Sequence, residues 1–592
     1  MKITKLILLL MVSLMVLICT SSCDIDDTKE FIHQIQDDLS DIEYTISDNG
    51  SYYTVTDFNN PFKKHYRIKN TYRGLPVRAI YIWGDHENVR SVYIPESVMY
   101  IADGSFAEFP SVKRIEVSKK NETFQSKDGH LYTKDGKTLI QYAVGKVETS
   151  FFVPEGVETI GCWSFYSSTL MSVVIPDSVN KIADFAFKNS ELLKEVAIQG
   201  SLQSIGKSAF YSCYSLRDVV FSDSLSCIGE YAFAECISLE NISFPEGLSE
   251  IGNNAFCNCD SLKQIYLPTS LSKVGDGVFV DCDELMEIVI GEGNALFTSK
   301  NGALYSKDCS KLLWVKKFYE GTFVVDSFVK EIASRAFYGC SGISDVIFSD
   351  SLVIVGDEAF SGCTSLSSLK LPNGLLSIGE KAFIGCTSLA NIEIPDSVEF
   401  IGKKAFSNCI SLEHFDIPQG MKEISDELFL GCISLVDIVI PDHIVSIGSS
   451  SFNGCKLIKE MVIPQSVIYI GSSAFKACAS LENVSLLAQI KYIPNSMFDG
   501  CTSLKNVEIL YDISGIGGGA FYQCDSLETI DIPATVSKID KYAFQRCESL
   551  KTINFGGTVE QWKQLSYAIY CSPDIVYCSD GQITKDGKVV YN

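Results

Sequence analysis

The cysteines are the residues of this chain that could most readily do chemistry, and there are 22 of them in 592 residues. Fourteen follow a phenylalanine by three positions, as Cys409 follows Phe406. Zinc sites need thiolates that converge on one point, usually with spacings such as Cys-x-x-Cys, and this spacing does not occur in the sequence. The fourteen are Cys213, Cys236, Cys259, Cys282, Cys340, Cys363, Cys386, Cys409, Cys432, Cys455, Cys478, Cys501, Cys524 and Cys547.

Most of these thiols have the character of packing groups. Copies of one position in a repeated unit point the same way, which disfavours disulfides, and a buried thiol packs as a small apolar group with a weak donor. Ser168 and Ser190 replace the thiol in early copies, so the position accepts a small polar group. We therefore predict a ladder of free, buried thiols, and the one disulfide candidate that we single out is Cys571 with Cys578, near the C-terminus.

Neither the histidines nor the glycine-rich stretches form a recognisable catalytic site. No His-Glu-x-x-His motif is present, and no nucleophile, base and orienting acid can be assembled from the spacing. Gly515–Ala520 fits a dinucleotide pattern and Gly200–Ser208 nearly fits a phosphate loop, but both lie in a repeated Ile-Gly-x-x-Ala-Phe segment rather than a βαβ unit. We predict no enzyme activity, no cofactor and no metal site. The six histidines are His33, His65, His86, His130, His414 and His443.

A repeat of 23 residues must position all of these groups. One copy reads Leu389-x-x-Ile392-x-Ile394-Pro395-x-x-Val398-x-x-Ile401-Gly402-x-x-Ala405-Phe406-x-x-Cys409. The Leu-x-x-Ile-x-Ile segment alternates like a strand, and proline ends it. We expect the Ile-Gly pair to make a turn in which glycine supplies an unusual backbone angle, while Ala-Phe fills the space between coils. Copied units keep one strand direction, so a solenoid with parallel pairing is predicted.

The 23-residue repeat is interrupted twice, by inserts spanning residues 121–150 and 294–321. Both contain Asn-x-x-Phe-x-Ser-Lys, then Asp128-Gly129 in the first and Asn301-Gly302 in the second, which are hairpin turn signals. The inserts are therefore expected to be enlarged coils that carry β-hairpins. Two interpretations remain open: bulged structural coils, or part of a binding surface.

The chain ends carry further signals. Lys2 and Lys5 precede an apolar run and small residues before Cys23, which is typical of a secretion signal over residues 1–22 with acylation of Cys23, or else of ordinary secretion. Residues 23–43 are expected to be an acidic tether. Residues 44–100 should form an N-terminal cap with the first coils, beginning with a hairpin around Asn49-Gly50. Residues 101–555 should be the solenoid, and residues 556–592 a C-terminal cap.

These motifs resemble the BspA-like, treponemal-type leucine-rich repeat family, in which strands end in Ile-Pro and turns contain Ala-Phe-x-x-Cys. The match covers residues 44 to 592, and the segment Phe555–Trp562 is similar to the closing cap of such proteins. The resemblance implies a right-handed solenoid of short parallel β-strands with irregular or short-helical turns, which we expect to have about 18 coils. It also implies a bacterial surface or secreted protein, and several members of the family act as adhesins.

Charge limits the partners. With 49 basic and 73 acidic residues the net charge is −24, so nucleic acid is excluded as a partner because its phosphates need clustered Lys and Arg. The expected partners are host or bacterial surface proteins. We predict a monomer that meets a membrane only through a lipid anchor, on the outer or the cytoplasmic membrane, or a secreted protein.

The exposed side of the strands is the predicted binding face. Its two stripes flank the first Ile of Ile-x-Ile; one is acidic and rich in amides, and the other carries apolar and aromatic residues that mark contact surfaces or simply suit strands. Alternatives to protein binding are a passive spacer or surface-layer component and a glycan-binding accessory, for which exposed aromatic platforms would be needed. The residues of the predicted binding face are Glu195, Asp218, Val220, Gln264, Tyr266, Glu287, Val289, Asp345 and Ile347.

Overall fold

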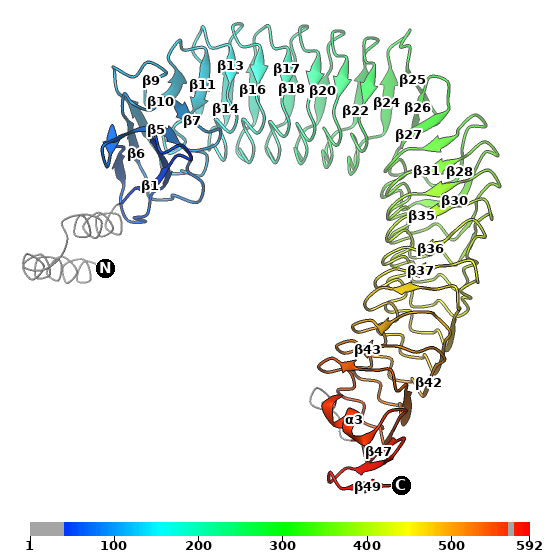
Figure 1. The fold of residues 1–592 in the computed structure, drawn as a ribbon. Helices are drawn as coiled ribbons and strands as arrows, with labels where there is room; N and C mark the ends of the chain where they lie inside the picture. Colours follow the sequence, from blue (N-terminus) through cyan, green and yellow to red (C-terminus); the bar gives the residue numbers. More distant parts are fainter. Residues whose placement is uncertain (1–40, 566–572) are drawn as a thin grey trace, which may run out of the picture. The chain divides into compact units, whose positions relative to one another are not determined.

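The computed structural model describes residues 41–565 and 573–592 (Figure 1). The chain divides into unit 1, which ends at Cys259, and unit 2, which begins at Asp260. The predicted signal peptide 1–22, the predicted acylation site Cys23, the predicted tether up to residue 40, and Cys571 lie outside the described residues. Within the described ranges, no helix combines the length and the apolar character that a membrane crossing requires.

Unit 1 begins with a small sheet. The strand β1 (Glu43–Ile46) pairs antiparallel with β2 (Tyr53–Asp57), which confirms the predicted hairpin. The loop between them is longer than a two-residue turn: Gly50 has φ +69°, and the Asn49 side chain accepts a hydrogen bond from the Ser51 amide at 3.1 Å. The sheet continues through β5 (Leu75–Ile80), which pairs with β2, with β4 (Thr71–Tyr72) and with β7 (Tyr100–Ile101).

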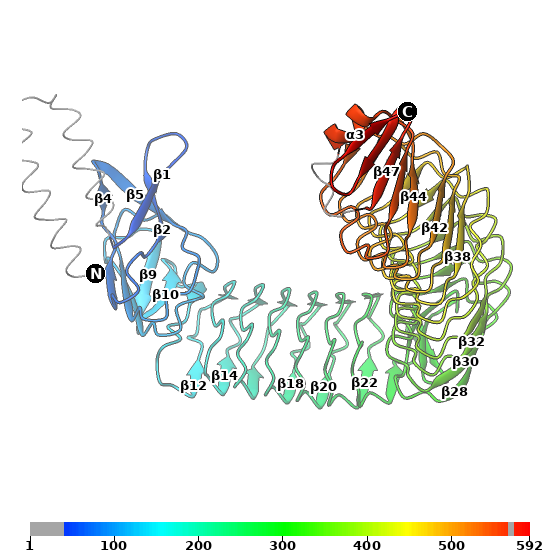
Figure 2. The ribbon, with the colours of Figure 1, turned by 90° about the horizontal axis from the view of Figure 1, so that it is seen from below.

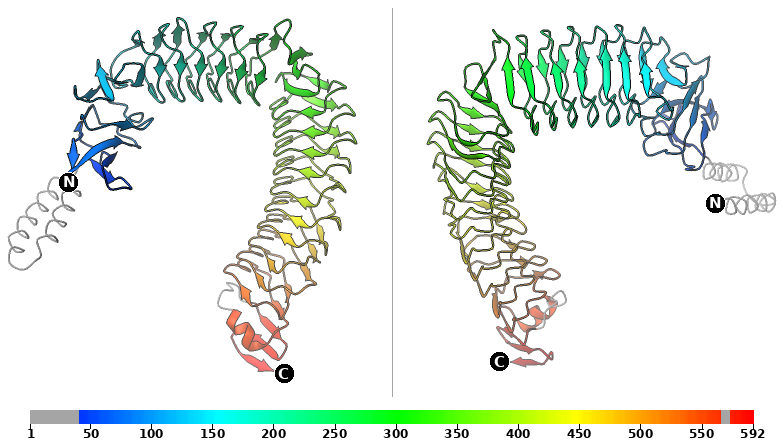
Figure 3. Two further views of the ribbon diagram at one scale, coloured as in Figure 1. Left: turned by 45° about the horizontal axis from the view of Figure 1, so that its top comes forward. Right: turned by 180° about the vertical axis from the view of Figure 1, so that it is seen from behind.

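Each regular coil contributes two strands, one to each of two parallel rows (Figures 2 and 3). The long-strand row holds the Leu-x-x-Ile-x-Ile segments, and the short-strand row holds the residue pair that ends in the Ile or Val before glycine. In unit 1 the long-strand row begins with β3 (His65–Arg67), β6 (Ser91–Ile94) and β8 (Arg114–Val117), and continues with β12 (Ser150–Phe152), β14 (Ser172–Ile175), β16 (Glu195–Ile198), β18 (Asp218–Val220) and β20 (Asn241–Ser243).

The short-strand row of unit 1 follows the same order. Pairing is parallel, with partners 22 residues apart where Thr159 faces Lys181 and 23 apart in the later pairs, as Ser204 faces Cys227. This confirms the predicted parallel arrangement, but the Ile-Gly pair is not simply a turn, because the residues before glycine form a second sheet. The strands are β13 (Thr159–Ile160), β15 (Lys181–Ile182), β17 (Ser204–Ile205), β19 (Cys227–Ile228) and β21 (Glu250–Ile251).

Unit 2 repeats this architecture. Its long-strand row contains β22 (Gln264–Leu267), β24 (Glu287–Ile290), β28 (Gly321–Val324), β30 (Ile343–Ile347), β32 (Ser368–Lys370), β34 (Asn391–Glu393), β38 (Glu460–Ile463), β40 (Asn483–Leu486), β42 (Asn506–Ile509), β44 (Thr529–Ile532) and β46 (Thr552–Phe555). Its short-strand row contains β23 (Lys273–Val274), β29 (Glu331–Ile332), β31 (Ile354–Val355), β33 (Ser377–Ile378), β35 (Phe400–Ile401), β36 (Glu423–Ile424), β37 (Ser446–Ile447), β39 (Tyr469–Ile470), β41 (Tyr492–Ile493), β43 (Gly515–Ile516) and β45 (Lys538–Ile539).

The described residues make about 23 turns, more than the 18 or so predicted. The N-terminal strands and the enlarged coils continue the same rows without the Ala-Phe-x-x-Cys signature. The fold class is otherwise as predicted, a solenoid of stacked parallel strands, and helix within the described residues is confined to positions 559–565.

The glycine of the repeated Ile-Gly pair has a different role from the one predicted. Gly402 does not have a positive φ; instead, a Cβ there would lie 2.5 Å from the Glu380 amide nitrogen of the preceding coil. Glycine is needed because two backbones approach closely, not because of its backbone angle. The left-handed residue comes two positions later, at Lys404 with φ +60°.

Phenylalanine and cysteine form the core beside this turn, as predicted. In unit 1 the rings of Phe165, Phe187, Phe210, Phe233 and Phe256 stack with centroids 4.6 to 5.3 Å apart. The fourteen thiols of the ladder are buried and are not joined in disulfides, and a typical one, Cys386, donates to the Phe360 carbonyl at 3.1 Å. Burial raises the pKa of the Cys386 thiol to about 12. Ser190 donates to the equivalent carbonyl of Phe165 at 2.9 Å, which explains why serine can replace cysteine here.

Unit 2 ends in a compact cap, in which β46 pairs parallel with β47 (Ile575–Cys578). β47 continues antiparallel into β48 (Gly581–Thr584) and β49 (Val589–Tyr591). The helix α3 (Val559–Leu565) begins with a capping box, because Thr558 and Gln561 exchange side-chain to backbone hydrogen bonds at 2.8 and 3.3 Å. Trp562 buries its ring near Phe555, with centroids 5.4 Å apart. The cap therefore covers apolar surface at the end of the stack.

Candidate binding surface

The two inserts position the surfaces of interest, and they share one architecture. The first contains β9 (Phe124–Lys127), β10 (His130–Thr133) and β11 (Thr138–Gln141); the second contains β25 (Phe297–Lys300), β26 (Ala303–Ser306) and β27 (Lys311–Val315). Each is an antiparallel meander whose last strand joins the short-strand row. Both residues of each hairpin turn have positive φ, as in a type I′ turn, which confirms the two turn predictions.

One buried asparagine anchors each insert to the coil before it. The Asn121 side-chain amide donates to the carbonyls of Pro95 and Val98, both at 2.8 Å. Its oxygen accepts from the amides of Thr123 and Phe124 at 2.9 and 2.7 Å. Asn294 makes the same four hydrogen bonds in unit 2. These asparagines are scaffold residues, because every side-chain polar atom is used internally.

The first insert contains a buried histidine that the second lacks. His130 stacks on Tyr142 with ring centroids 4.6 Å apart, and its Nδ1 accepts the Ala143 amide at 3.0 Å. Burial and the nearby Lys146 ammonium lower the pKa of His130 to about 3, so the ring is neutral near pH 7. The corresponding residue of the second insert is Ala303. A neutral, buried ring that accepts a backbone hydrogen bond has a structural role, not that of a catalytic base.

In unit 1 the structure places three predicted binding residues side by side. Glu195 on β16 is paired with Asp218 on β18, and both side chains are exposed. Asp218 accepts a hydrogen bond from Asn241 of the next coil at 3.1 Å. Val220 is 70% exposed, so its position in the predicted apolar stripe agrees with the geometry.

In unit 2 four predicted residues come together on β22 and β24. Gln264 donates to Glu287 at 2.8 Å, so this part of the acidic stripe is braced between coils. Tyr266 and Val289 occupy paired positions, but Val289 is only half-exposed. The second insert follows β24, and the remaining two residues, Asp345 and Ile347, lie beyond it on β30.

The coil that follows the second insert exposes an apolar pair. Val324 on β28 is paired with Ile347 on β30, and the two side chains are 60% and 51% exposed. Phe323 and Val346, one residue earlier on each strand, are buried. Val324 was missing from the predicted binding face because the insert breaks the 23-residue register. Asp345 is half-buried, unlike the exposed acidic residue expected.

The coil after the first insert has the same feature. Phe152 on β12 is 70% exposed while Phe151 beside it is buried, and Phe152 is paired with the half-buried Val174 on β14. Each insert is therefore followed by a strand that presents a large apolar side chain on the long-strand row. We call these two sites the post-insert surfaces: Phe152 with Val174 in unit 1, and Val324 with Ile347 in unit 2.

Polar residues elsewhere on the row satisfy each other. Lys370 and Glu393, 23 residues apart, form an ion pair at 2.6 Å, and Asn506 donates to Asn483 at 2.8 Å. The short-strand row exposes further apolar residues that were not predicted, Phe400 and Tyr469 among them. A large apolar residue directly before Ile-Gly is the sequence feature that could have identified them.

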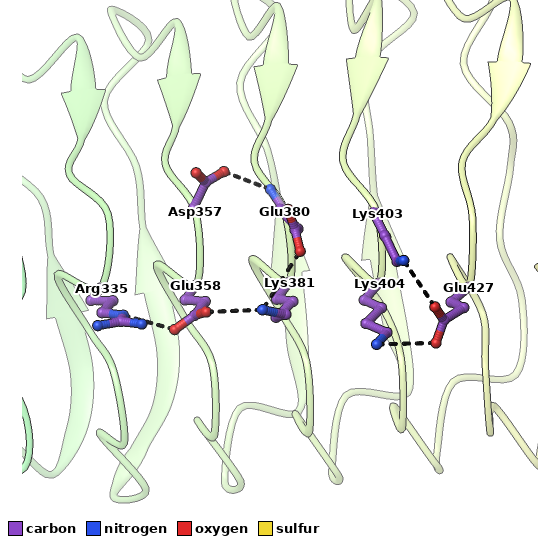
Figure 4. A network of polar contacts seen from close by, with 8 residues as sticks. All are labelled: Arg335, Asp357, Glu358, Glu380, Lys381, Lys403, Lys404 and Glu427. Carbon is purple, nitrogen blue, oxygen red and sulfur yellow. Dashed lines mark hydrogen bonds and ion pairs between the residues drawn. The ribbon is translucent and has the colours of Figure 1, made fainter. Parts of the chain in front are cut away.

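Ion pairs also link successive coils of unit 2 near the positive-φ position that follows the short strand (Figure 4). Glu358 accepts from Arg335 at 2.7 Å and from Lys381 at 3.3 Å, and these three residues are spaced by 23 along the chain. The two cations lower the pKa of Glu358 although its partial burial opposes this. Glu427 is held in the same way by Lys403 and Lys404, both at 3.1 Å. These groups neutralise one another, so the network is best explained as scaffold.

No arrangement suited to metal binding is present in the part of the chain that the structure describes, where no three His, Cys, Asp or Glu side chains cluster suitably. His414 lies 3.7 Å from Asp437, and both side chains are more than half exposed. The long-strand row offers an extended face rather than an enclosed site.

Comparison with known proteins gives the family. The model of the BspA-type leucine-rich repeat region matches in six copies, over residues 79–128, 145–226, 203–318, 330–459 and 422–551. The chain belongs to this family. A comparison with curated protein sequences gave no significant match.

Several solved structures are similar in fold. A leucine-rich cell surface protein from Faecalibacterium prausnitzii has 20% identity, with 89% of this chain and 96% of that chain covered and a TM-score of 0.30. A leucine-rich repeat protein from Bacteroides ovatus has 22% identity, coverage of 87% and 98%, and a TM-score of 0.37. The pneumococcal vaccine antigen PcpA has 17% identity, coverage of 91% and 97%, and a TM-score of 0.23. These likenesses concern the fold alone.

Proposed function

We propose that this protein is a non-catalytic cell-surface or secreted protein that binds other proteins through its post-insert surfaces. Membership of the BspA-type leucine-rich repeat family supports a protein-binding role. A surface location and a lipid anchor at Cys23 belong to the same proposal. The partner is a host or bacterial surface protein, and a glycan partner or a passive spacer role are the alternatives that the experiment below separates.

The exposed apolar pair of Val324 and Ile347 carries this proposal. Two large side chains lie at paired positions and leave more than half of their surface in solvent. Exposed apolar side chains that lie together are typical of contact surfaces, and a strand row can present them on a rigid backbone. Ion pairs and amide hydrogen bonds occupy polar side chains elsewhere on the same row, which also exposes the apolar residues Val220, Val439 and Val462.

The test is saturable binding of the purified chain to immobilised matrix proteins and to bacterial cells. Val324→Lys with Ile347→Lys should weaken binding at least tenfold and leave the unfolding midpoint unchanged. Val147→Lys is a control for an added surface lysine, because Val147 is 94% exposed in the loop before β12 and lies off the long-strand row. A passive spacer would bind nothing saturably. Binding that the apolar pair does not affect, or that free oligosaccharides abolish, would contradict the proposal.

A further inference from the structure

A separate cavity in the N-terminal cap of unit 1 has the features of a binding site. Its volume is about 450 Å³, and it lies between the loop after β2 and the loop after β5. It is lined by Asp57, Phe58, Asn59, Asn60, Pro61, Trp83, Gly84, Asp85, His86, Glu87, Asn88 and Val89.

The walls of this cavity are fixed by hydrogen bonds between its two loops and their neighbours. Asn88 donates to the Pro61 carbonyl at 3.0 Å, which joins one loop to the other. Glu108 accepts from the Gly84 amide at 3.1 Å, and its carbonyl accepts from the His86 amide at 3.0 Å. The cavity is therefore preorganised, so little ordering is needed when a ligand enters.

The lining is negatively charged. Asp57, Asp85 and Glu87 contribute carboxylates, and the lining residues include no Lys or Arg. A neutral ligand that excluded water from these groups would leave their charge uncompensated, which is unfavourable. The cavity therefore favours a cationic ligand.

The buried His86, which lines the cavity, is an independent observation that points to a ligand. Its side chain is nine-tenths buried against Phe58 and Phe109, with ring centroids 5.8 and 4.6 Å away. Its Nε2 faces Asp57 across 3.3 Å but has no hydrogen-bond partner in the described residues. Burial lowers the pKa of His86, so the ring is neutral near pH 7 and does not compensate Asp57.

An exposed indole borders the same cavity. Trp83 is 56% exposed, and its ring lies 6.1 Å from that of the exposed Tyr81. An ammonium or guanidinium group over an indole face gains a favourable cation–π interaction, and an apolar stem can lie along the same ring.

We propose that this cavity binds a Lys or Arg side chain of a protein partner, with the cationic group between Asp57 and Asp85 and its stem along Trp83. The site is distinct from the post-insert surfaces. It would give a contact specific for a basic residue, whereas those surfaces give apolar contacts, so either proposal can fail without the other.

The test uses the full chain and short fluorescent peptides in fluorescence polarisation at 150 mM salt. One peptide contains a single lysine, a second contains arginine, and a third replaces the basic residue with norleucine. We expect the basic peptides to bind at least tenfold more tightly than the norleucine peptide. Trp83→Ala and Asp85→Asn should each weaken binding at least fivefold without changing the unfolding midpoint, since both side chains are exposed.

Asp223→Asn is the matched control, because Asp223 is exposed on unit 1 away from the cavity and its substitution changes the net charge equally. If Asp223→Asn weakens binding as much as Asp85→Asn, the attraction is a general property of an acidic protein and the proposal is overturned. Equal binding of the norleucine peptide, or displacement of the basic peptide by a neutral oligosaccharide, overturns it too.

Discussion

The two inserts interrupt the solenoid in the same way but differ in their centres. Both anchor to the preceding coil through one asparagine with four hydrogen bonds, and both turn through a residue pair with positive φ. The first encloses His130, where the second has Ala303. The first is followed by Phe152 on the strand row, and the second by Val324. The shared asparagines and turn residues build the enlarged coil. The residues that differ change its interior, at His130 and Ala303, and the exposed strand after it, at Phe152 and Val324.

The anchoring asparagines should show the largest effect. We expect Asn121→Ala or Asn294→Ala to destabilise its unit by about 3 to 5 kcal/mol, because two buried amides and two buried carbonyls lose their partners together. Chemical denaturation measures the change. Asn391→Ala, at an exposed position on β34, is the control and should cost less than about 0.5 kcal/mol. A similar loss of stability at all three positions would contradict the anchoring role of Asn121 and Asn294.

The next difference between the inserts depends on pH. The pKa of His130 is lowered to about 3 in the folded protein, so the unfolded chain binds a proton that the folded chain does not. The stability that depends on a neutral His130 is fully present above about pH 6.5 and is lost as the pH falls toward 3. We expect the first insert to lose about 2 kcal/mol between pH 7 and pH 5, whereas the second, with Ala303, does not.

Native-state hydrogen exchange of β10–β11 and β26–β27 measures this difference directly. His130→Gln should abolish the pH dependence in the first insert. Asp308 cannot mimic the effect in the second, because its ordinary pKa of 3.8 and its folded value of about 2, lowered by hydrogen bonds from Ser306 and Ser310, both lie below pH 5. An equal response of both inserts would show that His130 is not the cause.

The two hairpin turns should differ less in the stability that they lose on substitution of their glycines. Gly129→Ala and Gly302→Ala both introduce a Cβ at positive φ, which costs about 1 kcal/mol. A Cβ at Gly129 would lie 3.2 Å from the rigid Lys113 carbonyl, but at Gly302 the close atom belongs to the Lys316 side chain, which can move. We expect Gly129→Ala to be the costlier change, as measured by exchange of β9–β10 and β25–β26. The opposite order would mean that the Lys316 side chain is held rigidly.

The smallest effect is expected from an ion pair in the second insert. Lys300 contacts Asp326 at 2.6 Å, and the first insert has Pro154 at the position of Asp326. Lys300→Met should lower the thermal midpoint of unit 2 slightly at low salt, and the difference should vanish in 1 M salt because the lysine is exposed. A loss that persists in high salt would indicate that the side chain packs rather than pairs.

Much of this architecture could be predicted from residues that repeat. Phe406 and Cys409 defined the core column, and Asp128-Gly129 and Asn301-Gly302 defined the hairpins. The prediction was wrong at Gly402, because a one-letter pattern does not distinguish a glycine required by backbone contact from one required by a positive φ. It also missed Val324, whose strand position depends on an insert length that the 23-residue register does not describe. The Trp83 cavity depends on loops that have no repeat.

Hydroxyl-radical footprinting of the chain with and without a saturably bound surface protein tests the central claim most directly. The method reports the exposure of individual side chains. We predict that the partner protects Phe152, or Val324 and Ile347, while Val147 and Phe400 stay as reactive as in the free chain. Protection confined to Phe400 and Tyr469 on the short-strand row, with the post-insert surfaces unchanged, would contradict the account.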